Sequence, residues 1–156
     1  MTNKYFKSEN ITENDLSFVC YMIERVARRL RQPNRYVVDA LGYDELYRQL
    51  SLASVLHSEN PLKVESEWIE ENRLASGNFD VTKVREDLDV TVPSATQMGK
   101  VYKRLIIGTL TPGEDWVHAL TRVYSSPICK VLDNYNTGAF YEPSPVIARA
   151  YVTGSF

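Results

Sequence analysis

Apolar residues recur every three or four positions through the first part of the chain, which is the spacing of one face of an α-helix. Thr12 and Asp15 stand at the start of this stripe with the spacing of a capping box, in which each side chain accepts a hydrogen bond from the other residue's backbone N–H. The stripe itself is made of Leu16, Val19, Cys20, Ile23, Val26, Ala27 and Leu30. The pattern therefore predicts an amphipathic helix over residues 12–31.

Proline and glycine mark the ends of the next elements. Pro33 stops the first helix and suits the first turn of a second, short one, because its fixed φ matches helical geometry. Gly42 ends that second helix, since glycine adopts a left-handed cap without steric cost. Leu46 and Leu50, one helical turn apart, predict a third short helix over residues 43–50.

Capping residues stand directly before a proline at four further places. These pairs are Asn60-Pro61, Thr111-Pro112, Ser126-Pro127 and Ser144-Pro145. A capping side chain followed by proline matches the last non-helical position and the first helical position of a helix. Capping boxes that begin at Ser94 and Thr111 repeat the same signal. Together with apolar residues at helical spacing, they predict helices over residues 62–73, 95–109, 113–124, 127–135 and 145–152.

The predicted fold class is all-α, a multi-helical bundle of about eight short helices. The run Val-Thr-Val at residues 90–92 favours a strand, but it is too short and too close to a proline to support a sheet. The sequence Ala-Ser-Gly-Asn at residues 75–78 is typical of a linker. We therefore expect an N-terminal helical unit over residues 1–75 and a C-terminal helical unit over residues 79–156, packed either as two bodies or as one.

The composition is that of an ordinary folded protein, with 44% of the 156 residues apolar and 24% charged. The net charge is −2, and residues 1–75 hold 10 basic and 12 acidic side chains while residues 76–156 hold 8 of each. Neither half is therefore basic enough to bind nucleic acid by bulk attraction. No apolar stretch is long enough to span a membrane, and the N-terminus lacks the apolar run of a signal peptide, so we expect a cytoplasmic protein.

Residue types that carry catalysis or bind metals are sparse. His57 and His118 each lack a second ligand at the spacing of a helical zinc site, and Cys20 and Cys129 lie on apolar helical faces as small core residues. The chain has no phosphate loop, no dinucleotide-binding glycine pattern and no nucleophile elbow. We expect no enzyme activity, no cofactor and no metal. Two alternative functions stay open, and the second of them is a small enzyme whose site is assembled from residues far apart in the sequence.

The first alternative is a DNA-binding regulator, because one segment imitates a helix-turn-helix. Residues 81–88 are predicted to form a short amphipathic helix, followed by the capped helix that begins after Ser94. The candidate base or phosphate contacts are Thr96, Gln97, Lys100, Lys103 and Arg104. The connection at residues 89–93 is longer than the usual turn, and acidic residues flank it, so an ordinary helical hairpin is favoured over nucleic-acid binding.

Aromatic residues gather in the last third of the sequence. They include Tyr124, Tyr135, Phe140, Tyr141, Tyr151 and Phe156. Tyrosines with few charges around them are typical of a contact surface, because tyrosine offers a large area at low conformational cost; packing of a core is the alternative. Residues 140–143 are expected to be extended. We predict Phe140, Tyr141 and Tyr151 as contacts for a protein partner, and a homo-oligomer is also compatible with such a surface.

Three short motifs in the first half carry a family resemblance. They are Leu-Ser-Phe-Val-Cys-Tyr-Met-Ile-Glu at residues 16–24, Gly-Tyr-Asp-Glu-Leu-Tyr at residues 42–47 and Val-Leu-His-Ser at residues 55–58. Through them, residues 13–75 resemble a bacterial family of small helical proteins of unknown function, often encoded beside ADP-ribosyltransferase-like proteins and regarded as antitoxins. The resemblance implies a non-enzymatic interaction protein that neutralises a partner toxin by steric binding.

Overall fold

The chain folds into helices joined by turns and by one long irregular segment. The computed structural model describes residues 1–156 and contains seven α-helices, two 3-10 helices and one isolated antiparallel bridge between Thr2 and Asn10. The α-helices are α1 (Glu13–Leu30), α2 (Asn34–Leu56), α3 (Pro61–Glu71), α4 (Ala95–Gly108), α5 (Trp116–Tyr124), α6 (Cys129–Leu132) and α7 (Ser144–Thr153). The 3-10 helices are η1 (Glu86–Leu88) and η2 (Ala139–Tyr141). The all-α prediction is confirmed.

Helix α1 forms as its sequence pattern predicts. The backbone N–H of Asp15 donates to the Thr12 side chain at 3.2 Å, and the Thr12 N–H donates to the Asp15 carboxylate at 2.8 Å, which completes the capping box. The helix ends at Arg31, which adopts the left-handed conformation with φ 53°. Its apolar stripe is buried along the whole length of the helix, so this is the element that organises the rest of the fold.

Helix α2 joins two elements that the sequence predicts as separate. Gly42 has φ 74° and ψ 175°, which are not helical values, so one helical segment ends there as predicted and a second begins directly after it across a kink. A residue with a Cβ would be strained at this φ, which is why glycine stands there. The predicted helix over residues 43–50 therefore continues directly from the second one and runs on to Leu56.

Two of the predicted capping signals act as expected. The Leu62 N–H donates to the Asn60 side chain at 3.0 Å at the start of α3, and the Gln97 N–H donates to the Ser94 hydroxyl at 3.1 Å at the start of α4. These bonds satisfy backbone donors that have no partner inside the helix. The helices predicted over residues 62–73 and 95–109 are confirmed.

The capping box predicted at Thr111 does not begin a helix; residues 111–114 form an isolated turn. The Glu114 N–H donates to the Thr111 carbonyl at 3.1 Å, and the Thr111 N–H donates to the Glu114 carboxylate at 3.3 Å. Gly113 lies in the left-handed region with φ 78°, which interrupts any helix at this point. Helix α5 begins only at Trp116, with Asp115 as its capping residue.

The last two predicted helices differ from the observed ones in length or in capping residue. Helix α6 has four residues, Cys129–Leu132, so only the middle of the predicted helix over residues 127–135 forms, with turns on either side. Ser144 is the first residue of α7 and not its cap, because Pro143 occupies the capping position. Residues 140–143, expected to be extended, instead include the 3-10 turn η2, in which the Tyr141 N–H donates to the Gly138 carbonyl at 3.0 Å.

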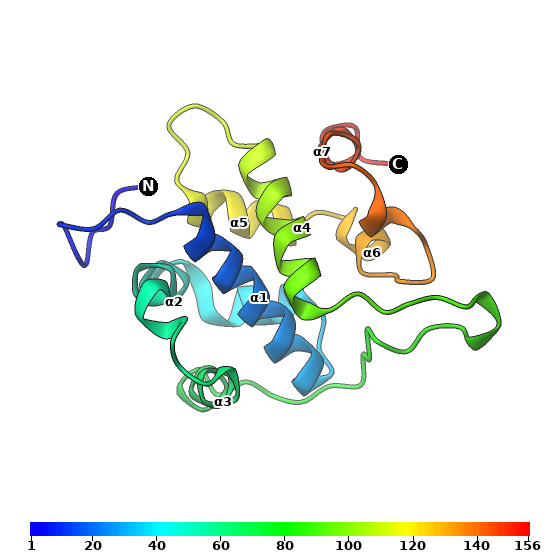
Figure 1. The fold of residues 1–156 in the computed structure, drawn as a ribbon, viewed down its shortest axis with the longest axis horizontal. Coiled ribbons are helices and arrows are strands. Elements are labelled where there is room, and N and C mark those ends of the chain that lie inside the picture. Colours follow the sequence, from blue (N-terminus) through cyan, green and yellow to red (C-terminus); the bar gives the residue numbers. More distant parts are fainter.

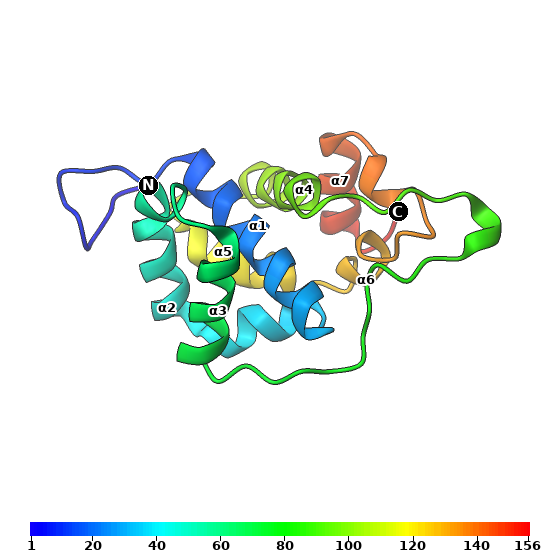
Figure 2. The same cartoon turned by 60° about the horizontal axis from the view of Figure 1, so that its bottom comes forward.

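The predicted helix over residues 81–88 is absent apart from η1. Side chains in this stretch satisfy the backbone in other ways: the Thr82 N–H donates to the Asp80 carboxylate at 3.0 Å, and the Arg85 N–H donates to the Asn136 side chain at 2.7 Å. None of residues 81–88 is buried, so little apolar contact favours a helix here. Figures 1 and 2 show the segment between α3 and α4 as a long loop along one side of the molecule.

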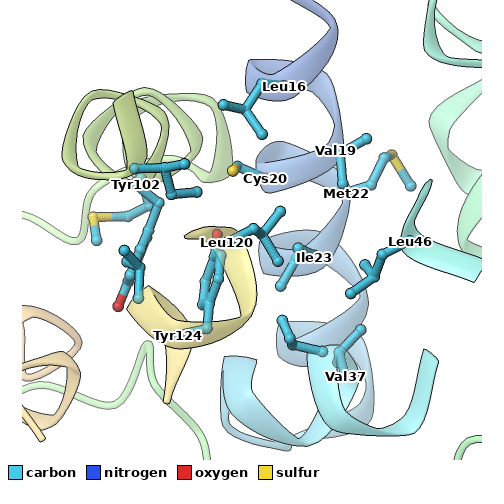
Figure 3. Close-up of a cluster of buried hydrophobic side chains, with 14 of the residues drawn as sticks. Leu16, Val19, Cys20, Met22, Ile23, Val37, Leu46, Tyr102, Leu120 and Tyr124 are labelled. Atoms are coloured by element: carbon cyan, nitrogen blue, oxygen red, sulfur yellow. The ribbon is translucent and has the colours of Figure 1, made fainter. Parts of the chain in front are cut away.

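The N-terminal and C-terminal halves share one core. Figure 3 shows Leu16, Cys20 and Ile23 of α1 close to side chains of α4 and α5. On the other side of α1, the core continues to Val37 and Leu46 of α2. One cluster of 37 buried apolar residues therefore includes members of both predicted units. None of the helices is both long and apolar enough to cross a membrane.

Helices α1 and α4 approach each other closely in the core, at Gly99. A Cβ atom at Gly99 of α4 would lie 2.9 Å from the backbone nitrogen of Tyr21 on α1, so any side chain there would push the helices apart. On the same side of α4, the ring of Tyr102 stacks on that of Tyr124 at 4.3 Å between centroids. This packing fixes the orientation of α4, and with it the outward face that the next section describes.

Candidate functional site

A groove lies between the outward face of α4 and the segment formed by η2 and the start of α7. It has a volume of about 330 Å³. Figure 2 shows the two helices next to each other, with α4 viewed nearly along its axis. We call this hollow the α4–α7 groove. Its lining residues are Gln97, Lys100, Val101, Arg104, Leu105, Phe140, Tyr141, Glu142, Pro143, Ser144 and Ile147.

Helix α4 supplies a positively charged wall. Gln97, Lys100 and Arg104 follow one another at steps of three and four, so they stand on one face of the helix. Lys100 and Arg104 are exposed, and neither forms an ion pair with any acidic side chain. Glu142 is the one acidic residue in the lining. The groove therefore offers two unneutralised cations to a bound molecule.

The opposite wall is aromatic. Tyr141 is 64% exposed, and its ring packs on that of Phe140 at 4.3 Å between centroids. Phe140 is only 3% exposed and meets Tyr135 edge to face. Most of the Phe140 side chain belongs to the core, although the residue also lines the groove, so its predicted contact with a partner stays a prediction. Its role is to hold Tyr141 at the edge of the groove.

Tyr151, the third predicted contact, lies elsewhere. Its hydroxyl accepts a hydrogen bond from the Arg122 guanidinium at 3.0 Å. Arg122 also donates to the Thr109 carbonyl at 2.6 Å and to the two carboxylate oxygens of Glu114 at 2.8 and 2.7 Å. The hydrogen bonds from Arg122 lower the pKa of Glu114 to about 2. Tyr151 therefore anchors α7 to the end of α4 and does not line the groove.

The five residues predicted to contact DNA separate into two groups. Gln97, Lys100 and Arg104 line the groove, but Lys103 faces α1, where its ammonium lies 3.5 Å from the Glu13 carboxylate. Thr96 is exposed on the first turn of α4 and is not part of the lining. Because residues 81–88 form no helix apart from η1, the predicted helix-turn-helix is absent, while DNA contact by these side chains stays a prediction.

A buried polar network that no sequence pattern predicts centres on Glu24. Glu24 of α1 is 1% exposed; its carboxylate accepts hydrogen bonds from Arg28 at 3.1 Å and from the Tyr135 hydroxyl at 2.5 Å. Arg28 also donates to the Pro93 carbonyl at 2.8 Å. The network therefore ties α1 to the start of α4 and to the segment after α6. Burial, with the charge of Glu24 next, raises the pKa of the Tyr135 hydroxyl.

Asp115, His118 and Tyr43 form a second polar cluster. One carboxylate oxygen of Asp115 accepts the backbone N–H groups of Val117 and His118, both at 2.9 Å, and thereby caps α5. The other oxygen accepts the Tyr43 hydroxyl at 3.1 Å and contacts the Nδ1 atom of His118. Burial, then the bond to Asp115, raises the pKa of Tyr43 to about 12. The cluster orients an exposed imidazole, and none of its three residues lines the α4–α7 groove.

The two cysteines are buried thiols. Both are free, and burial raises the pKa of Cys20 and that of Cys129 to about 12, so each stays protonated at neutral pH. A protonated thiol is a poor nucleophile and a poor metal ligand. No group of three or more histidine, cysteine, aspartate or glutamate side chains converges in a way that could hold a metal ion.

Comparison of the chain with protein-family models, with curated proteins and with solved structures finds no match. The resemblance of residues 13–75 to an antitoxin-like family therefore stays a prediction. The α4–α7 groove brings together Lys100 and Arg104, which were predicted as DNA contacts, and Tyr141, which was predicted as a partner contact.

Proposed function

We propose that this protein is a non-enzymatic interaction module that binds a partner protein through the α4–α7 groove, and that the partner is a toxin which it covers and so neutralises. The observation that carries the first part is the meeting of two unpaired cations, Lys100 and Arg104, with the exposed ring of Tyr141 across one groove. The antitoxin part is supported by the resemblance of residues 13–75.

The groove has the composition of the centre of a protein interface. Tyrosine and arginine are enriched among residues that dominate binding energy, and here they stand over a floor made by buried Val101, Leu105 and Ile147. Such a floor holds a partner side chain away from water, while exposed charges at the edge set orientation and speed association. A specific interface covers about 800 Å² per partner, so the groove serves as the anchor of a larger contact.

The charge of the groove favours an acidic partner segment. Lys100 and Arg104 contribute two positive charges, against the single negative charge of Glu142. Because both cations are free of internal ion pairs, a partner carboxylate need not displace an existing contact. Residues 13–75 take no part in lining the groove. Helix α4 packs on α1, and α1 in turn packs on α2 and α3.

The test mixes the purified protein with the product of the neighbouring gene and follows the complex by size-exclusion chromatography, with rescue of growth as the second readout. The variant Lys100→Glu with Arg104→Glu should abolish both, and Tyr141→Ala should weaken both. The matched control replaces exposed Lys7 and Lys83, which are not part of the lining, by glutamate and should change neither readout. A complex that survives the double groove variant would contradict the groove as the binding site, and absence of any complex with wild type would contradict the antitoxin role.

A further inference from the structure

Three tyrosine rings stand around one point beside the loop that precedes α1. They belong to Tyr5, in that loop, and to Tyr43 and Tyr47, on α2. The ring centroid of Tyr47 lies 6.0 Å from each of the other two, and its plane is tilted by 59° and 54° against theirs, so the rings do not stack on one another. None of the three lines the α4–α7 groove. We call the space between these three rings the tyrosine cage.

A cation occupies the tyrosine cage. The ammonium of Lys4 lies over all three rings. Its nitrogen is 4.2 Å from the centroid of Tyr47 and 5.5 Å from the centroids of the other two rings. A cation within about 6 Å of a ring centroid is attracted to the negative face of the ring. No carboxylate lies within 4.0 Å of this ammonium, so the ring faces are what holds the charge.

The two walls on α2 are fixed by hydrogen bonds. The Tyr47 hydroxyl donates to the Thr2 carbonyl at 2.8 Å, and the Tyr43 hydroxyl donates to the Asp115 carboxylate at 3.1 Å. Tyr47 is also only 7% exposed, so the core holds most of its side chain. Burial and the bond to Asp115 raise the pKa of Tyr43 to about 12, so this ring stays a neutral phenol at neutral pH.

The third wall is held through a buried side chain. Asn3 is 2% exposed, and its side-chain nitrogen donates to the Ser51 carbonyl of α2 at 3.3 Å. Its side-chain oxygen accepts the backbone N–H groups of Tyr5 at 3.0 Å and of Phe6 at 2.9 Å. The loop is therefore tied to α2 on either side of Lys4. Because all three walls are in place beforehand, little conformational freedom is lost when a cation binds.

The cage is better suited to a methylated ammonium than to the ammonium of Lys4. A lysine ammonium is compact and strongly hydrated, and its three N–H donors find no acceptor in a ring face. A quaternary ammonium has no N–H to remove from water. Replacing a hydrogen by a methyl group adds a bond of about 1.5 Å. At the two 5.5 Å walls this leaves about 4 Å between the methyl carbon and the ring, which is van der Waals contact.

We propose that the tyrosine cage binds a trimethylammonium group, and that Lys4 is an internal occupant which this group displaces. The Lys4 side chain is exposed, so it leaves by rotation about its own bonds while Asn3 keeps the loop in place. An exposed cation–π contact favours the occupied state by only about two- to fivefold, so displacement costs little. The trimethylammonium group belongs either to a free small molecule or to a methylated lysine side chain, and both present the same chemistry to the rings.

The test measures binding to the full-length protein by heteronuclear NMR titration with three probes of similar shape. These are choline, 3,3-dimethylbutan-1-ol, in which carbon replaces the charged nitrogen, and ethanolamine, which lacks the methyl groups. Choline should bind saturably and shift the amides around Tyr5 and Tyr47, and the other two should bind at least about fivefold more weakly. Absence of saturable choline binding, or equal binding of the neutral alcohol, would overturn the proposal.

A fourth probe identifies the source of the group. It is acetyl-trimethyllysine methylamide, which carries the same head on a lysine stem. Tighter binding of this probe than of choline would support the cage and assign the head to a modified protein. Tighter binding of choline would support the cage and assign the head to a free small molecule.

Variants locate the site and test the displacement. Lys4→Met keeps an unbranched side chain without charge and should tighten choline about two- to fivefold, because the internal competitor is gone. Tyr5→Leu removes a wall that is 48% exposed, so the fold is kept, and it should weaken choline about two- to fivefold. Tyr47→Leu removes the nearest ring and should weaken choline more.

The matched control is Phe6→Leu, the same kind of change at the next residue of the loop, 41% exposed and outside the cage; it should bind choline like wild type. Unchanged choline affinity in Lys4→Met would refute the displacement. Unchanged affinity in both Tyr5→Leu and Tyr47→Leu, or an equal loss in Phe6→Leu, would assign choline to another surface and refute the cage.

Discussion

The two faces of α4 differ in what covers them. Met98, Tyr102 and Ile106 are fully buried against the neighbouring helices, whereas Lys100 and Arg104 stay exposed beside α7. Apolar periodicity predicts the first face, because burial of apolar side chains is the reason for the stripe. It says nothing of the second face, whose surroundings depend on where α7 docks. Stability therefore depends on one face of α4, and the proposed binding function depends on the other.

The largest difference between the faces should appear when a buried side chain is truncated. Ile106→Ala should reduce the free energy of unfolding by about 2–5 kcal/mol, since it leaves a cavity in the shared core. Lys100→Ala, on the outward face, should change it by less than about 0.5 kcal/mol. Urea unfolding followed by circular dichroism measures both values. Similar losses for the two variants would mean that α4 is not buried on one side only.

A smaller effect tests the crossing of α1 and α4. Gly99→Ala should cost about 1–3 kcal/mol, because the added methyl group meets the backbone of Tyr21. Gly108→Ala, in the same helix, meets nothing within 4 Å and should be neutral or stabilising by up to about 1 kcal/mol. The comparison uses one chemical change at two sites, so thermal or urea unfolding of the pair isolates the close approach. A stable Gly99→Ala protein would show that the helices can separate without cost.

The smallest effect concerns the attachment of α7, which fixes the position of the outward wall. Arg122 donates hydrogen bonds both to the Glu114 carboxylate and to the Tyr151 hydroxyl on α7. Glu114→Gln removes the carboxylate and should lower the free energy of unfolding by about 1 kcal/mol at neutral pH. The pKa of Glu114 is lowered from 4.5 to about 2 in the folded protein, so this stabilisation exists above pH 4.5 and is lost as the pH falls through about 2. Unfolding curves of wild type and variant should therefore converge in acid. A difference that persists unchanged at the lowest pH would point to packing instead of charge.

Local signals in the sequence predict part of the fold well. The capping box at Thr12, the Asn60 cap and the Ser94 cap each act within a few residues, and the helix that follows each one also buries apolar side chains against the core. The signals at Thr111 and over residues 81–88 are equally local, but there a left-handed glycine and the lack of an apolar partner prevent helix formation.

The candidate site could be predicted only in fragments. The pattern singled out Lys100, Arg104 and Tyr141, but assigned them to two different functions, because their meeting depends on how α7 packs against α4. The bond between Glu24 and Tyr135 joins residues 111 positions apart, and no local spacing announces it. A second hollow, lined by Pro33, Phe79 and Pro127 among others, has the same origin, since its walls come from separate segments.

The most direct test of the central claim is hydrogen exchange of the backbone amides in the complex with the neighbouring gene product, compared with the free protein. If the α4–α7 groove holds the partner, binding should slow exchange at Ser144–Thr153 and at the exposed turns of Ala95–Gly108, and should leave Pro61–Glu71 unchanged. Slower exchange confined to Pro61–Glu71 and its neighbours, with the groove amides unaffected, would contradict the account.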